Sequence, residues 1–146
     1  CALYGFRKPS LKPLLAVAYV SSLATKLSDT LASEVGKAYG KTCYLSTTLK
    51  RVPPGTEGAV SLEGTLAGFA GSVLAASYAV AVGLTPRAAL LPVVVAAFVA
   101  TTCESWLGAG AQGKVKWLTN EVINFLNTLI GAGVGAALSF RLFNLY

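Results

Sequence analysis

Four long apolar segments, separated by short polar stretches, dominate the pattern of this chain. Each comes close to the ~20 residues that an α-helix needs to cross the hydrocarbon core of a bilayer. Thr85-Pro86 separates the second segment from the third, and proline is common in the first turn of a helix. The pattern therefore predicts four membrane helices, at residues 13–38, 59–83, 87–107 and 121–143.

The stretch between the first two segments, residues 40–58, has a different character. It is polar and rich in Thr, Gly and Pro, too short for a separate domain and too varied for a low-complexity linker. Loops of this length inside a compact domain usually carry function. We therefore expect a functional loop that joins the first two helices.

Composition narrows the class of protein. Of the 146 residues, 54% are hydrophobic and 12% are charged, whereas about a quarter are charged in soluble domains. The fold class expected is all-α, a polytopic membrane helix bundle that forms a single integral membrane domain over residues 1–146. The chain contains no Met and opens at Cys1, so we expect a product truncated at the N-terminus.

The acidic residues are the most informative charged groups. If the four segments cross the membrane in turn, all six acids fall on one side of the bilayer, which predicts a polar site at one membrane face. Carboxylates at the ends of membrane helices are costly and usually serve a function. For Asp29, a structural ion pair with Lys26, three residues earlier, is as good an interpretation as a functional role. The six are Asp29, Glu34, Glu57, Glu63, Glu104 and Glu121.

Small and polar residues recur at helical spacing within the segments. Gly64 and Gly68 have the GxxxG spacing that lets two membrane helices approach closely. Asn120, Asn124 and Asn127 share one face of the fourth helix. These stripes predict a polar cavity open to one side, although such residues are also ordinary packing residues in membrane bundles.

Basic residues and glycines surround the loop at residues 40–58 and suggest a site for a polyphosphate. Glycine lets backbone N–H groups approach an anion, and Lys or Arg balances its charge. Residues 36–42 are similar to a P-loop, but one residue is missing between the glycines and the segment ends a helix. Contact of the basic residues with lipid headgroups is the alternative. Histidine is absent, which excludes His-assisted nucleophilic catalysis.

Two blocks of sequence resemble a known family. The first covers residues 28–41 (SDTLASEVGKAYGK) and 52–68, and the second covers residues 104–112 and 119–124 (TNEVIN). Both resemble the phytyl-phosphate kinases of plants and algae, within a wide family of polytopic membrane proteins. The resemblance implies an integral protein of a chloroplast membrane, envelope or thylakoid. It also implies transfer of the γ-phosphoryl group of a nucleoside triphosphate, CTP, to phytyl monophosphate, which yields phytyl diphosphate for tocopherol synthesis.

Phosphoryl transfer depends on positioning and on charge neutralisation by Mg²⁺ with Lys or Arg, so the site residues follow from this hypothesis. The catalytic candidates are Asp29, Glu34 and Glu104. The candidate ligands of Mg²⁺ are Asp29, Glu63, Glu104 and Glu121. The candidates for binding nucleotide and phosphate are Lys37, Lys41, Lys50, Arg51, Gly55, Thr56, Gly58, Ser61, Asn120 and Asn124.

The expected partners are an isoprenoid monophosphate, a nucleoside triphosphate and membrane lipid. The chain has no basic stripe interleaved with aromatic residues, so nucleic acid is not expected as a partner. Two other functions stay open from the sequence. A CTP-dependent cytidylyltransferase would attack the α-phosphate at the same site, and a membrane transporter would pass an ion through the charged cavity.

Overall fold

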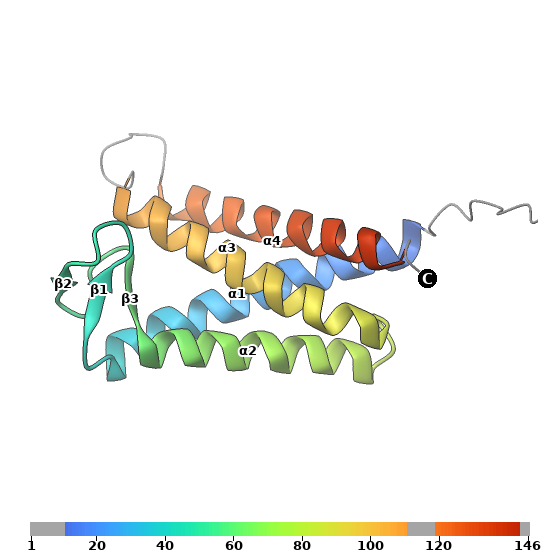
Figure 1. Ribbon diagram of the computed structural model, residues 1–146, viewed down its shortest axis with the longest axis horizontal. Coiled ribbons are helices and arrows are strands. Elements are labelled where there is room, and N and C mark those ends of the chain that lie inside the picture. Colours follow the sequence, from blue (N-terminus) through green and yellow to red (C-terminus); the bar gives the residue numbers. More distant parts are fainter. Residues whose placement is uncertain (1–10, 111–118, 144–146) are drawn as a thin grey trace, which may run out of the picture.

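The computed structural model, which describes residues 11–110 and 119–143, is a bundle of four helices with a small sheet at one end (Figure 1). A single 3-10 turn, η1, leads into the third helix. The helices are α1 (Leu11–Tyr39), α2 (Leu62–Ala81), η1 (Arg87–Ala89), α3 (Leu90–Gly110) and α4 (Asn120–Phe143). The strands are β1 (Cys43–Leu45), β2 (Arg51–Val52) and β3 (Ala59–Ser61).

The helical membrane bundle expected from the sequence is confirmed. Three stretches in the described part of the chain are long and apolar enough to cross a membrane: Leu62–Ala81, Arg87–Gly110 and Asn120–Leu142. The remaining helix, α1, has 29 residues and is long enough, but it carries several charged side chains in its second half. It lies at the centre of the bundle, where α2, α3 and α4 all pack on it.

Small residues allow α1 to approach its neighbours closely. A Cβ atom added at Gly68 would lie 2.8 Å from the carbonyl oxygen of Ser28, and one at Gly64 would meet the carbonyl oxygen of Ala32. The close backbone approach predicted from the GxxxG spacing of α2 is therefore present. The buried core below this crossing consists of Val and Ala side chains from α1, α2, η1 and α3.

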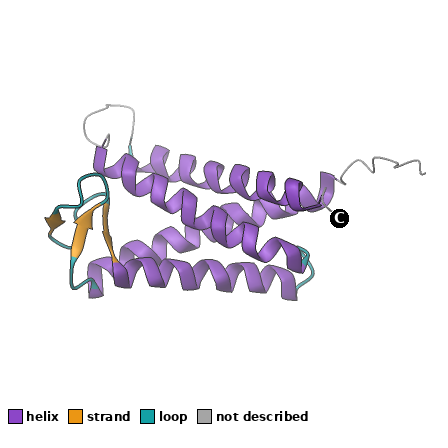
Figure 2. Ribbon diagram, viewed as in Figure 1, coloured by secondary structure: helices purple, strands orange, loops and turns teal. Residues whose placement is uncertain are grey.

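The polar stretch after α1 is not a simple loop, which corrects the expectation from the sequence. It forms a three-stranded antiparallel sheet in the order β2-β1-β3, with Cys43 opposite Ser61 (Figure 2). The predicted start of the second helix at residue 59 is wrong for the same reason, because residues 59–61 belong to β3. Ser61 caps α2 by accepting a hydrogen bond from Gly64 N at 3.1 Å, so the helix begins at Leu62.

Two contacts hold the sheet against the end of α3. Ser46 Oγ donates to the carbonyl oxygen of Ser105 at 2.9 Å. Gly58 has φ +71° and lies so close to Ala109 that a Cβ atom would collide with the backbone of that residue. The sheet therefore covers the end of the bundle where the helices carry their polar side chains.

We expect Gly58→Ala to be more destabilising than Gly55→Ala. Both glycines have positive φ, which costs an L-residue about 1–2 kcal/mol. Only at Gly58 does the added methyl group also overlap a neighbour, which typically adds about 1–3 kcal/mol. Thermal unfolding of both variants in detergent measures the difference, and equal losses would show that the sheet does not depend on this contact.

Candidate functional site

A polar pocket of about 420 Å³ lies at the sheet end of the bundle, between α1, α3, the start of α4 and the turn before β3. Its walls come from segments that are distant in sequence and meet only in the fold. Among the residues that line it are eight of the site residues predicted from sequence: Asp29, Lys37, Gly55, Thr56, Gly58, Ser61, Glu104 and Asn120.

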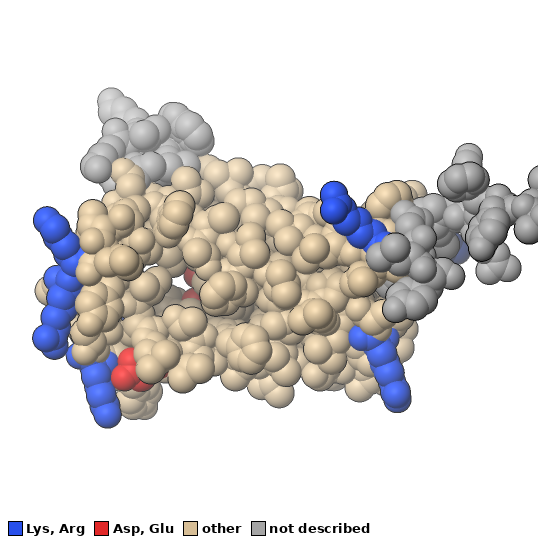
Figure 3. All heavy atoms as spheres, viewed as in Figure 1, with Lys and Arg blue, Asp and Glu red and all other residues tan. Residues whose placement is uncertain are grey.

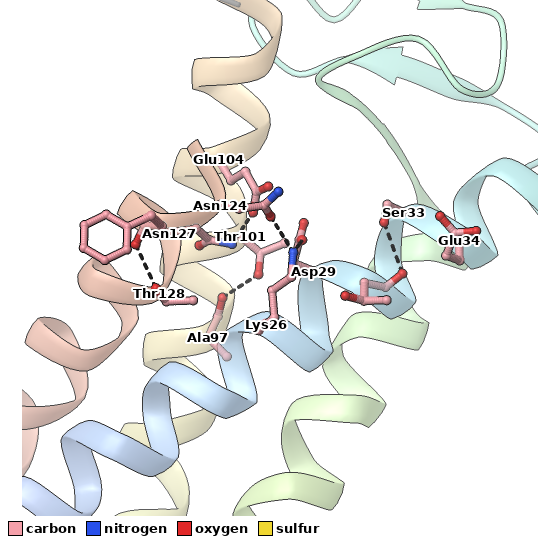
Figure 4. A network of polar contacts seen from close by, with 12 residues as sticks. Lys26, Asp29, Ser33, Glu34, Ala97, Thr101, Glu104, Asn124, Asn127 and Thr128 are labelled. Carbon is pink, nitrogen blue, oxygen red and sulfur yellow. Dashed lines mark hydrogen bonds and ion pairs between the residues drawn. The ribbon is translucent and has the colours of Figure 1, made fainter. Parts of the chain in front are cut away.

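Two carboxylates face each other in this region, Asp29 from α1 and Glu104 from α3 (Figure 4). Lys26 Nζ lies 3.1 Å from Asp29 Oδ2, which confirms the ion pair considered from the sequence, and it also donates to Asn124 Oδ1. The amide of Asn127 donates to Glu104 Oε2. The two carboxyl groups thus have different partners, Lys26 for Asp29 and Asn127 for Glu104.

Helix periodicity explains why these side chains meet. Lys26 and Asp29 are three residues apart on α1, so they lie on the same face. Asn124 and Asn127 are likewise three apart on α4, and both point toward α1 and α3 (Figure 4). Asn127 is not among the site residues predicted from the sequence, although its spacing of three residues from Asn124 places both on one face of α4. It is 1% exposed.

The carboxylate pair fits a Mg²⁺ ion that also contacts phosphate. Within residues 11–110 and 119–143, no group of three or more Asp, Glu, Cys or His side chains lies close enough to hold a metal by itself. Mg²⁺ is commonly held by only one or two carboxylates plus substrate phosphates. In the same described residues, the buried Oδ1 of Asn127 has no hydrogen-bond partner, so an oxygen ligand remains beside Glu104.

The other sequence candidates lie outside the polar pocket as the described residues define it. Glu34 is exposed and pairs with Lys37 at 3.1 Å, and Glu63 accepts a hydrogen bond from the backbone N–H of Lys41 at 3.4 Å. Glu121 lies exposed in the first turn of α4, where a carboxylate complements the helix dipole. Arg51 is exposed in β2, and Lys50, the residue before this strand, is also exposed.

The charge distribution matches the sidedness expected from the sequence. All six acids lie toward the sheet end of the bundle. Three line the polar pocket, two contact lysines near the end of α1, and one lies in the first turn of α4; in that order they are Asp29, Glu57, Glu104, Glu34, Glu63 and Glu121. The face drawn in Figure 3 shows acidic atoms only toward the sheet end, whereas Lys and Arg occur at both ends. A divalent cation and a polyphosphate would therefore find complementary groups at the sheet end.

Comparison with known proteins identifies the family. Residues 1–132 match the family described as "Integral membrane protein DUF92". The chain belongs to this family. As a DUF92 protein it is an integral membrane protein, which agrees with its three apolar helices of membrane-spanning length in the described residues. No solved structure matches the chain.

Three relatives from different organisms are similar to this DUF92 chain. It is 57% identical over 120 residues to an uncharacterized membrane protein of Synechocystis sp., covering 82% of the chain and 46% of the relative. It is 47% identical over 134 residues to protein VTE6, chloroplastic, of Arabidopsis thaliana, covering 90% and 40%. An uncharacterized membrane protein of Methanocaldococcus jannaschii is 31% identical over 119 residues, covering 82% and 49%. The chain thus spans less than half the length of these relatives.

Proposed function

We propose that this chain contributes the catalytic site of a kinase in a chloroplast membrane. The enzyme transfers the γ-phosphoryl group of CTP to phytyl monophosphate and forms phytyl diphosphate for tocopherol synthesis. The two sequence blocks that resemble phytyl-phosphate kinases support this proposal, as does the similarity to a chloroplastic protein. The observation that carries it is the polar pocket, which brings a carboxylate pair, a lysine and a glycine-containing turn together.

The carboxylates would hold the metal. Asp29 and Glu104 supply two oxygen ligands, and Lys26 offsets part of their mutual repulsion. When bound, Mg²⁺ neutralises charge on the phosphates of the donor. Asn124 and Asn127 fix Lys26 and Glu104 by hydrogen bonds from the opposite helix.

The turn before β3 would hold the triphosphate. Gly55 and Gly58 both line the polar pocket with positive φ and no side chain, which would let a phosphate approach the backbone of the turn closely. Lys37 contributes a positive charge at the same pocket. The Oγ atom of Ser61 accepts from Gly64 N, which leaves its hydroxyl proton available for a phosphate oxygen.

The reaction needs little acid–base help from the protein. A phosphate monoester is largely ionised near neutral pH. An acceptor oxygen forms a bond to the γ-phosphorus of CTP while the bond from that phosphorus to the β,γ-bridging oxygen breaks, and CDP leaves. A site that contains carboxylates, amides and Lys but no His suits this chemistry.

Labelled CTP tests the proposal in the full-length protein. Phytyl monophosphate with γ-labelled CTP and Mg²⁺ is expected to give labelled phytyl diphosphate, because the γ-phosphoryl group moves to the lipid. Label transferred to the lipid from α-labelled CTP, with none from γ-labelled CTP, would identify a cytidylyltransferase and reject the kinase. Transfer of neither label, with Mg²⁺ and both substrates present, would also reject it.

A further inference from the structure

A second pocket, of about 290 Å³ and largely apolar, opens sideways between α2 and α3. Phe69 and Ser72 line it from α2, and Phe98, Thr102 and Trp106 line it from α3. Figure 3 shows the molecule hollowed in this region, with acidic atoms visible inside. Both helices are long and apolar enough to cross the membrane, so the opening faces hydrocarbon.

The apolar pocket adjoins the polar pocket. Residues from α1, β3 and α3 line both of them, and one of these residues is a member of the carboxylate pair. A molecule that enters the apolar pocket from the bilayer therefore meets Asp29 at its wall. The shared residues are Asp29, Ala32, Ser33, Ala59 and Ser105.

We infer that the apolar pocket holds the first part of the isoprenoid chain of the acceptor, with its phosphate directed toward Asp29. The nature of the headgroup rests on the proposed function. A volume of about 290 Å³ is near the lower limit for small-molecule sites, about 300–1,000 Å³, which suits one hydrocarbon chain better than the two chains of a phospholipid. Aromatic side chains at the pocket, including Phe69 and Phe98, give flat apolar contacts for a branched chain.

The length of the pocket sets which part of the chain is recognised. Its lining extends over eight residue steps of each helix, from Gly64 to Ser72 and from Phe98 to Trp106, or ~12 Å at the helical rise. The remainder of a long chain lies in the bilayer. The pocket therefore contacts the isoprene units nearest the phosphate, and binding does not depend on the units at the far end of the chain.

Photo-crosslinking tests the inference without requiring catalysis. The probe is phytyl monophosphate with a diazirine in an isoprene unit near the phosphate, added to the full-length protein in membranes and mapped by peptide mass spectrometry. We expect label on residues of α2 and α3 that line the pocket, such as Phe69, Phe98 and Trp106, and not on their outward-facing neighbours. Excess phytyl monophosphate should displace this label, and phosphatidylglycerol should not.

Two pairs of variants locate the probe within the pocket. Thr102→Trp and Thr65→Trp fill it from α3 and α2, and we expect each to reduce labelling at least about tenfold, as for other steric exclusion from apolar sites. Val99→Trp and Leu66→Trp are the matched controls, because both side chains are exposed on the same helices outside the two pockets that the structure describes. We expect the probe to label these two control variants to the same extent as the unmodified protein.

Label on the outer faces of the helices, or equal displacement by phosphatidylglycerol, would overturn the inference, as would equal labelling of filled and control variants. Activity in the same samples separates this result from the proposed function. Label in the pocket without transfer from γ-labelled CTP would reject the kinase and retain the chain-binding pocket. Transfer of the γ-phosphoryl group with no label in the pocket would retain the kinase and reject the chain-binding pocket.

Discussion

Replacing Asp29 with Asn is expected to lower kcat/KM for phytyl monophosphate by about 100- to 1,000-fold, the range for loss of one electrostatic partner in a preorganised site. The substitution keeps the shape of the side chain but removes the negative charge of Asp29, one of the two carboxyl groups that face each other between α1 and α3. It also leaves Lys26 without its partner at 3.1 Å. The measurement is the initial rate with γ-labelled CTP as a function of Mg²⁺ concentration.

The Mg²⁺ dependence distinguishes a ligand from a structural residue. If Asp29 binds the metal, Asp29→Asn raises the Mg²⁺ concentration needed for half-maximal rate, and Asp29→Glu restores part of the activity because it restores the charge. Thr30→Asn is the control, since this exposed neighbour on α1 lies outside both pockets of the described structure. An unchanged Mg²⁺ dependence in Asp29→Asn would remove Asp29 as a ligand.

Replacing Gly131 with Val is expected to reduce the free energy of unfolding by about 3 kcal/mol, the upper part of the usual range for overpacking. A Cβ atom at Gly131 would collide with the side chain of Thr25 and lie 3.3 Å from the carbonyl oxygen of Ser21, so α4 would have to move away from α1. That movement would also separate Asn124 from Lys26, which binds it across the same interface.

Gly133 provides a matched control on the same helix. It lies two residues further along α4, and an added Cβ atom would meet nothing within 4 Å. We expect Gly133→Val to change the free energy of unfolding little, because the added side chain meets no neighbour and glycine is itself unfavourable inside a helix. Thermal unfolding in detergent compares the two variants, and similar losses would show that α1 and α4 do not depend on the small residue at this crossing.

The helices and their polarity could be read from the sequence because both depend on local order. Runs of apolar residues of membrane-spanning length fix where the helices lie, and alternating crossings then place every acid at one end. The Gly64 and Gly68 spacing likewise predicted a close helix contact that the structure contains. The sheet was missed because its strands have only two or three residues, and such short strands are stabilised by pairing with distant segments.

The sequence by itself determined the class of protein, a helical membrane bundle with its carboxylates at one end. Only the tertiary structure decided that Asp29 meets Glu104 in the polar pocket while Glu63 and Glu121 lie outside it, and that Lys26 and Asn127 belong to the cluster. The physical reason is that residue spacing fixes which side chains share a helix face, but the rotation and crossing of the packed helices fix which faces meet.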